Sequence, residues 1–167
     1  VPLIGVVSRL VTQKGVDVIA QVLPRLLDLG TQIVILGPGE KWLEGELLGL
    51  SHASDRFRAW IGYNEALAHR IEAGADLFLM PSRYEPCGLN QLYSQRYGTL
   101  PVVRAVGGLD DTVENWNAVT GRGNGFKFGP YQADKLLEKI YEARFAYEDK
   151  ESWSRIQRNG MAVDNSW

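Results

Sequence analysis

The chain has 167 residues, about the length of one ordinary domain, and can bury a core without disulfides. Hydrophobic residues make up 45% and charged residues 23%, which excludes disordered, collagen-like and coiled-coil chains. A net charge of −2 argues against nucleic-acid binding through a basic face, and no apolar run approaches the roughly 18–20 residues of a membrane span.

Strand-length apolar runs alternate with helix-spaced runs through the first half of the chain. The pattern predicts strands at residues 3–7, 32–36 and 56–61, and helices at residues 16–27, 42–48 and about 64–73. Pro24 lies inside the first of these helices, and we expect a kink there because proline removes one backbone donor. Gly30 ends that helix.

The alternation continues in the second half. It predicts strands at residues 76–80, 100–104 and 126–128, helices at 89–97, 133–147 and 151–161, a turn at Gly107-Gly108 and a flexible loop at 121–125. Nearly continuous apolar strands that alternate with helices indicate a parallel sheet covered on both faces. The sequence therefore predicts a doubly wound, Rossmann-like α/β domain of strand order 3-2-1-4-5-6. Ligands bind such domains beyond the carboxyl ends of the first and fourth strands.

The loop after the first strand, residues 8–15 (SRLVTQKG), carries two cations where a dinucleotide-binding fold has glycines. Arg9 and Lys14 stand five residues apart. Such a pair suits a diphosphate whose negative charge grows as it leaves. The alternative is that both are solvated loop cations.

The loop after the fourth strand, residues 81–88 (PSRYEPCG), precedes a helix start, whose free N–H groups attract anions. A carboxylate, Glu85, stands just before that start, so the loop suits a ligand with both hydroxyls and phosphates. The alternative is that Glu85 only caps the helix. We interpret Cys87 as a small packing residue, because no histidine lies near it in sequence to make it a nucleophile.

Adjacent glycines follow the fifth strand. Gly107 and Gly108 can present two backbone amides to a second anion or to a sugar hydroxyl, although such a pair is also a common turn. Cations, a carboxylate and amides at neighbouring strand ends indicate a binder of a phosphorylated sugar or nucleotide. His52 and His69 lie at no metal-ligand spacing, so we expect no metal. A single cysteine makes a reducing compartment the default.

The same segments resemble bacterial glycogen synthases and plant starch synthases. The resemblance runs from residue 1 to Trp167 and is carried by SRL and QKG in residues 8–15, PSRYEPCGLNQLY at 81–93, YGTLPVV at 97–103 and GGLDDTV at 107–113. It covers only the C-terminal, nucleotide-binding half of these two-domain GT-B glycosyltransferases. The resemblance implies that residues 1–167 are one nucleotide-sugar-binding domain and that the N-terminal domain is absent.

Site roles follow from the resemblance. It implies that Arg9 and Lys14 hold the distal phosphate of the donor and stabilise the leaving ADP, and that Glu85 contacts the donor glucose. It also implies that Tyr63 stacks on adenine. The remaining substrate-binding positions are the backbone under the sugar and phosphate and its neighbours: Cys87, Gly88, Leu89, Asn90, Gly107 and Gly108.

The implied reaction is transfer of glucose from ADP-glucose to the non-reducing end of an α-1,4-glucan, with retention and without a cofactor. The absence of an Asp-x-Asp motif agrees with the metal-independent catalysis that the resemblance implies. Many retaining GT-B enzymes carry a second glutamate eight residues after the first, and Tyr93 stands there instead. This departure favours the glycogen and starch synthase branch and puts a second carboxylate contact to the ribose in doubt.

Three other interpretations stay open. The domain could use another donor such as UDP-glucose, or could be a non-catalytic sugar-nucleotide sensor. Half of an NAD-dependent dehydrogenase is disfavoured by the missing glycines after the first strand. By default we expect a bacterial cytoplasmic protein, with a plant plastid as the alternative.

Overall fold

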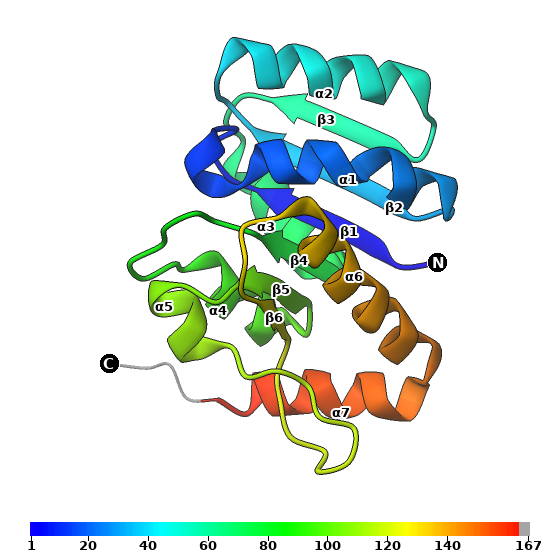
Figure 1. The fold of residues 1–167 in the computed structure, drawn as a ribbon, viewed down its shortest axis with the longest axis vertical. Helices are drawn as coiled ribbons and strands as arrows, with labels where there is room; N and C mark the ends of the chain where they lie inside the picture. Colours follow the sequence, from blue (N-terminus) through cyan, green and yellow to red (C-terminus); the bar gives the residue numbers. More distant parts are fainter. Residues whose placement is uncertain (164–167) are drawn as a thin grey trace.

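Six strands form one sheet in the computed structural model, which describes residues 1–163 (Figure 1). They are β1 (Leu3–Val7), β2 (Gln32–Gly37), β3 (Phe57–Ile61), β4 (Leu77–Met80), β5 (Leu100–Arg104) and β6 (Phe126–Phe128). Every neighbouring pair is parallel, and the order is β3-β2-β1-β4-β5-β6. The doubly wound prediction and its strand order are therefore confirmed. Trp167, the last residue of the resemblance, lies outside the described residues.

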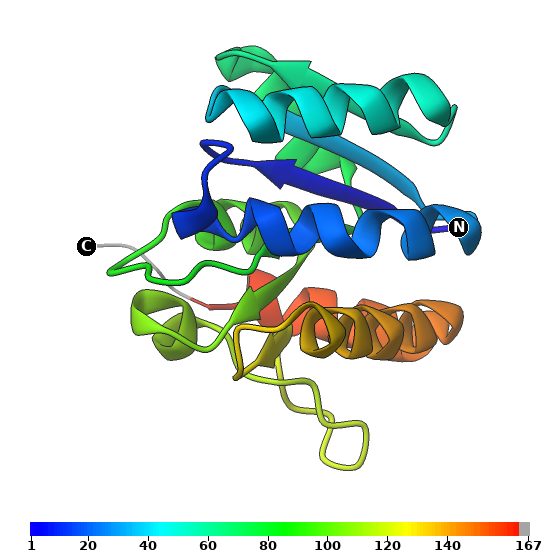
Figure 2. The same ribbon diagram turned by 45° about the horizontal axis from the view of Figure 1, so that its top comes forward.

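Helices lie on both faces of this sheet, with α1, α2 and α6 on one face and α3 and α4 on the other (Figures 1 and 2). Their bounds are η1 (Thr12–Lys14, a 3₁₀ turn), α1 (Val16–Asp28), α2 (Lys41–Ala53), α3 (Glu65–Gly74), α4 (Asn90–Tyr97), α5 (Gly107–Thr112), α6 (Ala133–Glu148) and α7 (Lys150–Met161). Pro24 lies inside α1 without ending it. No helix within residues 1–163 is both long and apolar enough to cross a membrane.

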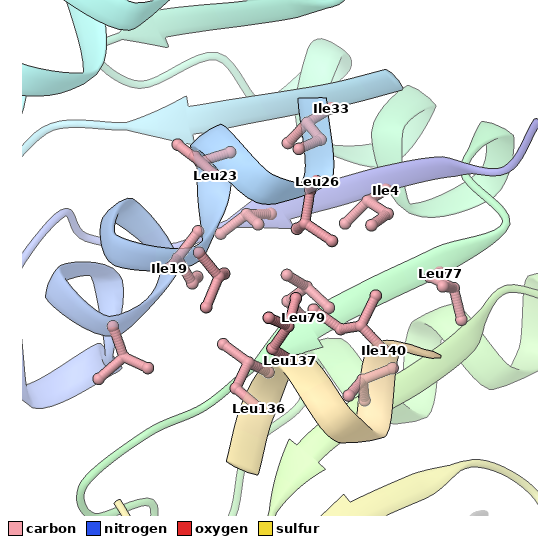
Figure 3. Packing of buried hydrophobic residues seen from close by; sticks show 14 of the residues in the cluster. Ile4, Ile19, Leu23, Leu26, Ile33, Leu77, Leu79, Leu136, Leu137 and Ile140 are labelled. Carbon is pink, nitrogen blue, oxygen red and sulfur yellow. The ribbon is translucent and has the colours of Figure 1, made fainter. Parts of the chain in front are cut away.

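The main core fills the space between the sheet and the α1–α6 face. Ile4 and Leu79 on the strands meet Leu26 of α1 and Ile140 of α6, all at most 2% exposed (Figure 3). On the opposite face, α3 approaches β1 at Gly5. A Cβ at Gly5 would lie 2.6 Å from Cγ2 of Ile71, so a larger residue would push α3 away from the sheet.

Two loop predictions need correction or refinement. The Gly107-Gly108 turn is instead the first turn of α5. The helix forms there because the absence of side chains allows close packing on a neighbouring loop: a Cβ at Gly108 would lie 2.1 Å from the carbonyl oxygen of Cys87. Residues 121–125, expected to be a flexible loop, are irregular but tied to α7, where Nδ2 of Asn159 donates to the carbonyls of Gly121 and Gly123.

Candidate functional site

Two adjoining cavities open at the carboxyl ends of the central strands, where the fold predicted a ligand site. The first has a volume of about 300 Å³ and lies between the β1–α1 loop and the β4–α4 loop. It is lined by Val7, Ser8, Arg9, Lys14, Leu79, Met80, Ser82, Glu85, Gly88, Leu89 and Asn90. Six of the predicted site residues are therefore brought together here: Arg9, Lys14, Glu85, Gly88, Leu89 and Asn90.

The two loops of the first cavity meet because glycine allows a close approach. Gly15 ends the 3₁₀ turn that carries Lys14 and has a φ of 77°, in the left-handed region. A Cβ there would also lie 2.0 Å from the carbonyl oxygen of Pro81. The backbone N–H of Arg83 then donates to the carbonyl of Gln13, at 2.9 Å. The loops lie side by side in Figure 2.

An ion pair joins the predicted cation to the predicted carboxylate. Nζ of Lys14 lies 2.7 Å from Oε2 of Glu85, and Oγ of Ser82 donates to the same oxygen at 3.3 Å. Glu85 is only 8% exposed. A buried carboxylate with charge-assisted hydrogen bonds is held in one position, which a side chain free in solvent is not.

The observed contacts bear on the two alternative interpretations, a helix cap at Glu85 and solvated loop cations at Arg9 and Lys14. The N-cap of α4 is Leu89, and Glu85 accepts from Lys14 and Ser82 rather than from the helix N–H groups. The helix-cap interpretation of Glu85 is therefore wrong. The solvated-cation interpretation is wrong for Lys14, whereas Arg9 is exposed where the two cavities adjoin.

The second cavity, of about 370 Å³, extends from β1 toward the start of α3. It shares Val7, Ser8, Arg9 and Asn90 with the first cavity, so the two are compartments of one groove. Tyr63 borders it and is 81% exposed. Nδ2 of Asn90 donates to the carbonyl of Val7 at 3.1 Å, which fixes part of the wall between the compartments.

Sequence reasoning missed three titratable side chains of α3 in the second cavity. Glu72 is 3% exposed, its Oε2 has no hydrogen-bond partner, and Nδ1 of His69 lies 3.5 Å from that oxygen. Burial raises the pKa of Glu72, and the nearby His69 opposes that rise. The sequence held one signal, the spacing of three side chains in the helix that follows Tyr63. Positions i, i+4 and i+7 of a helix lie on one face, and they are occupied here by Glu65, His69 and Glu72.

Three predicted residues lie outside the lining of both cavities. The side chain of Cys87 is exposed, so its interpretation as a packing residue is wrong. The N–H of Gly108 donates to the carbonyls of Glu85 and Pro86, each at 3.1 Å, and is not a bare amide. Gly107 and Gly108 instead support the Glu85 loop from behind, and their contact with a ligand stays a prediction.

Comparison with known proteins gives one family. The family model described as "Glycosyl transferases group 1" matches residues 1–161. A glycogen synthase of Koribacter versatilis is 53% identical over 167 residues, which are 99% of this chain and 34% of that protein. The chloroplastic/amyloplastic soluble starch synthase 1 of Solanum tuberosum is 48% identical over 172 residues, 99% of this chain and 27% of that protein. The chain thus spans between about a quarter and a third of the length of these relatives.

Solved structures agree with this result. The catalytic domain of Arabidopsis thaliana starch synthase IV, bound to ADP and acarbose, superposes with a TM-score of 0.92 at 38% identity. The match covers 99% of this chain and 35% of that one. An Anabaena HepE structure with UDP and glucose gives a TM-score of 0.71 at 23% identity over 96% of this chain and 42% of that one, a likeness of fold alone.

Proposed function

This chain belongs to the group 1 glycosyltransferases, and from that premise we propose that it is the donor-binding domain of a glycogen or starch synthase. In this proposal it binds ADP-glucose for retaining transfer of glucose to the non-reducing end of an α-1,4-glucan. The observation that carries the proposal is the ion pair between half-buried Lys14 and buried Glu85, in one compartment of a groove whose other compartment presents Tyr63. A nucleoside diphosphate sugar carries a charged diphosphate and a flat base, so one charged and one aromatic compartment suit it.

Each proposed role follows from the chemistry of its compartment. Arg9 and Lys14 bind the diphosphate and stabilise the negative charge that grows on ADP as the glycosidic bond breaks. Glu85 faces the glucose, where a carboxylate stabilises positive charge at the anomeric carbon. Tyr63 stacks on the adenine. The contacts of Cys87, Gly88 and Leu89 with the sugar and phosphate belong to the same proposal.

The acceptor glucan requires a second wall. The relatives are about three times as long as this chain, and we propose that their remaining part supplies that wall and the glucan contacts. Residues 1–167 would then act as one domain of a two-domain enzyme. A crevice between two domains excludes water and holds the acceptor only when both walls are present.

The experiment incubates the 167-residue chain with ADP-glucose and glycogen, and follows ADP release and glucan growth. Calorimetry on the same sample measures ADP binding. We expect a folded chain that binds ADP and elongates no glucan. Sustained elongation by this chain alone would overturn the two-domain arrangement, and absence of ADP binding would overturn the donor site.

The alternative donor is UDP-glucose. A purine offers Tyr63 a larger surface for stacking than a pyrimidine does, which favours ADP. Calorimetry with ADP and UDP at matched salt decides between the donors, and tighter UDP binding would reverse the assignment. If the domain were a non-catalytic sensor, Glu85→Gln would leave glucose transfer by an enzyme that contains this domain unchanged, whereas the proposal expects transfer to fall.

We also propose a cellular compartment for this protein. The single cysteine agrees with a reducing compartment, the bacterial cytoplasm by default and a plastid as the alternative. Cell fractionation with an antibody to this domain tests it, and recovery in an oxidising compartment would contradict it.

A further inference from the structure

Tyr131, in the segment between β6 and α6, lies between the two loops that carry Lys14 and Glu85. Its hydroxyl oxygen lies 2.5 Å from Oδ1 of Asp17 and 3.2 Å from the carbonyl oxygen of Thr12. Thr12 begins the 3₁₀ turn that ends at Lys14, and Asp17 lies in the first turn of α1. The hydroxyl therefore contacts both ends of the segment that carries Lys14.

The ring of Tyr131 contacts the other loop. The guanidinium carbon of Arg83, two residues before Glu85, lies 4.3 Å from the ring centroid, within the range of a cation–π contact. Nη2 of Arg83 also lies 3.4 Å from Oδ2 of Asp17. One tyrosine side chain thus bridges the Lys14 segment and the Glu85 loop.

Arg104 of β5 completes the cluster from a third direction. Its Nη1 donates to the carbonyl of Arg83 at 2.8 Å, and its Nε donates to the carbonyl of Gly129 at 2.9 Å. Its guanidinium lies 5.5 Å from the centroid of the Tyr131 ring. The segment before α6 is therefore attached to the sheet and to the Glu85 loop together.

We propose that Tyr131 is a positioning residue that sets the distance between Lys14 and Glu85, and so places the cation for the distal phosphate of the donor. The inference rests on the proposed function. The Lys14–Glu85 contact of 2.7 Å joins residues 71 positions apart, so it depends on how the two loops are held. Tyr131 lines neither cavity and acts only through the loops.

The hydroxyl of Tyr131 remains a hydrogen-bond donor over the neutral pH range. Burial, followed by the hydrogen bond with Asp17, raises the pKa of Tyr131 to about 12. The hydroxyl therefore stays protonated and continues to donate. Arg83 faces the ring and Asp17 faces the hydroxyl.

The test compares Tyr131→Phe with Tyr147→Phe in the 167-residue chain. Tyr131→Phe keeps the ring contact with Arg83 and removes only the hydroxyl, while Tyr147 is a half-buried tyrosine packed on Trp153 of α7. Calorimetry gives the affinities for ADP and for AMP, and thermal unfolding is recorded for each variant. We expect Tyr131→Phe to reduce the ratio of ADP to AMP affinity about three- to tenfold, the scale for residues that act without touching ligand. Tyr147→Phe leaves the ratio unchanged.

A second variant keeps the proposal testable if Tyr131→Phe folds poorly. Asp17→Asn retains an oxygen that accepts from Tyr131 and should preserve the ADP-to-AMP ratio, whereas Asp17→Ala should lower it as Tyr131→Phe does. The double variant Tyr131→Phe with Asp17→Ala should fall no further than Asp17→Ala alone, because Asp17→Ala already removes the hydrogen bond that Tyr131→Phe removes.

Equal weakening of ADP and AMP, or a lower melting temperature with an unchanged ratio, would assign Tyr131 a merely structural role and overturn the inference. A wild-type chain that binds no ADP would instead overturn the proposed function, so the two failures are distinguishable.

Discussion

The two compartments of the groove share a wall but are built in different ways. The first joins side chains from distant parts of the chain, and its cation and carboxylate are already paired with each other. The second takes its exposed aromatic ring and its buried carboxylate, which lacks a hydrogen bond at Oε2, from one stretch, residues 62–72, while the ends of β1 and β2 and the helix α4 line the rest. The first is organised before a ligand arrives by contacts between distant segments, whereas the aromatic ring and the carboxylate of the second are both placed by one local segment. We therefore expect variants in the first compartment to impair catalysis or the preference for ADP over AMP. Variants in the second compartment should alter the affinity for both nucleotides, or the stability of the fold.

The largest expected effect is that of Glu85→Gln in an enzyme that contains this domain together with its second wall. The carboxylate acts mainly when positive charge builds at the anomeric carbon, so kcat should fall by about 10²-fold or more. ADP binding should not weaken, because Lys14 loses its competing partner and is free for the phosphate. Steady-state kinetics and ADP titration measure both quantities. Turnover near the wild-type rate would remove Glu85 from the chemistry.

Lys14→Ala tests the other half of the ion pair. Lys14 is assigned to the distal phosphate, so ADP binding should weaken by about 1.5–3 kcal/mol, the scale of one charge-assisted hydrogen bond. AMP binding should weaken much less. Calorimetry on the 167-residue chain decides this, with Lys139→Ala as the control because Lys139 pairs with Glu142 on the surface of α6. Equal losses for both nucleotides would move Lys14 away from that phosphate.

Tyr63→Ala carries the comparison into the second compartment. An aromatic side chain that stacks on a base contributes about 1–3 kcal/mol, and the high exposure of Tyr63 favours the lower end. The loss should be the same for ADP and AMP, because both carry the base, while Tyr63→Phe retains binding. A loss confined to ADP would contradict the stacking role.

The sequence predicted the features that depend on local patterns and motifs, and it missed those that depend on contacts between distant segments. Strand order and the site at the ends of β1 and β4 were predictable, because apolar periodicity and the handedness of parallel connections leave few topologies. The positions of Arg9, Lys14 and Glu85 came from loop composition and from the family resemblance.

Pairing and packing were not predictable. The Lys14–Glu85 ion pair depends on Gly15 passing close to Pro81, a contact between segments far apart in sequence. The bridge at Tyr131 likewise spans three segments and has no motif. The start of α5 at Gly107 was missed because a glycine pair is typical of a turn. The contact that holds this helix start, from the N–H of Gly108 to the carbonyls of the Glu85 loop, joins segments that are not adjacent in sequence.

The smallest effect concerns Glu72, which we expect to lower stability at neutral pH. Burial raises the pKa of Glu72 in the folded state above that of the unfolded chain. The folded state therefore binds this proton more tightly, and the stabilisation is complete below the unfolded pKa. It is lost as pH rises through the folded pKa, when a buried carboxylate must ionise, and a protonated His69 offsets part of that loss.

Glu72→Met removes the carboxyl group and retains a side chain of similar length. An unsatisfied buried polar group costs about 1 kcal/mol or more. Its removal should raise Tm at pH 7.5 by about 2–4 °C in a domain of this size. The difference from the wild type should close as the pH falls below the unfolded pKa of glutamate, about 4.3, where Glu72 is protonated in both states. Glu142→Met on the exposed face of α6 should show no such pH dependence. Calorimetric melts across this pH range measure it. A wild type that is the more stable protein at pH 7.5 would mean that Glu72 has a partner that the folded chain supplies, and the second compartment would then be organised as fully as the first.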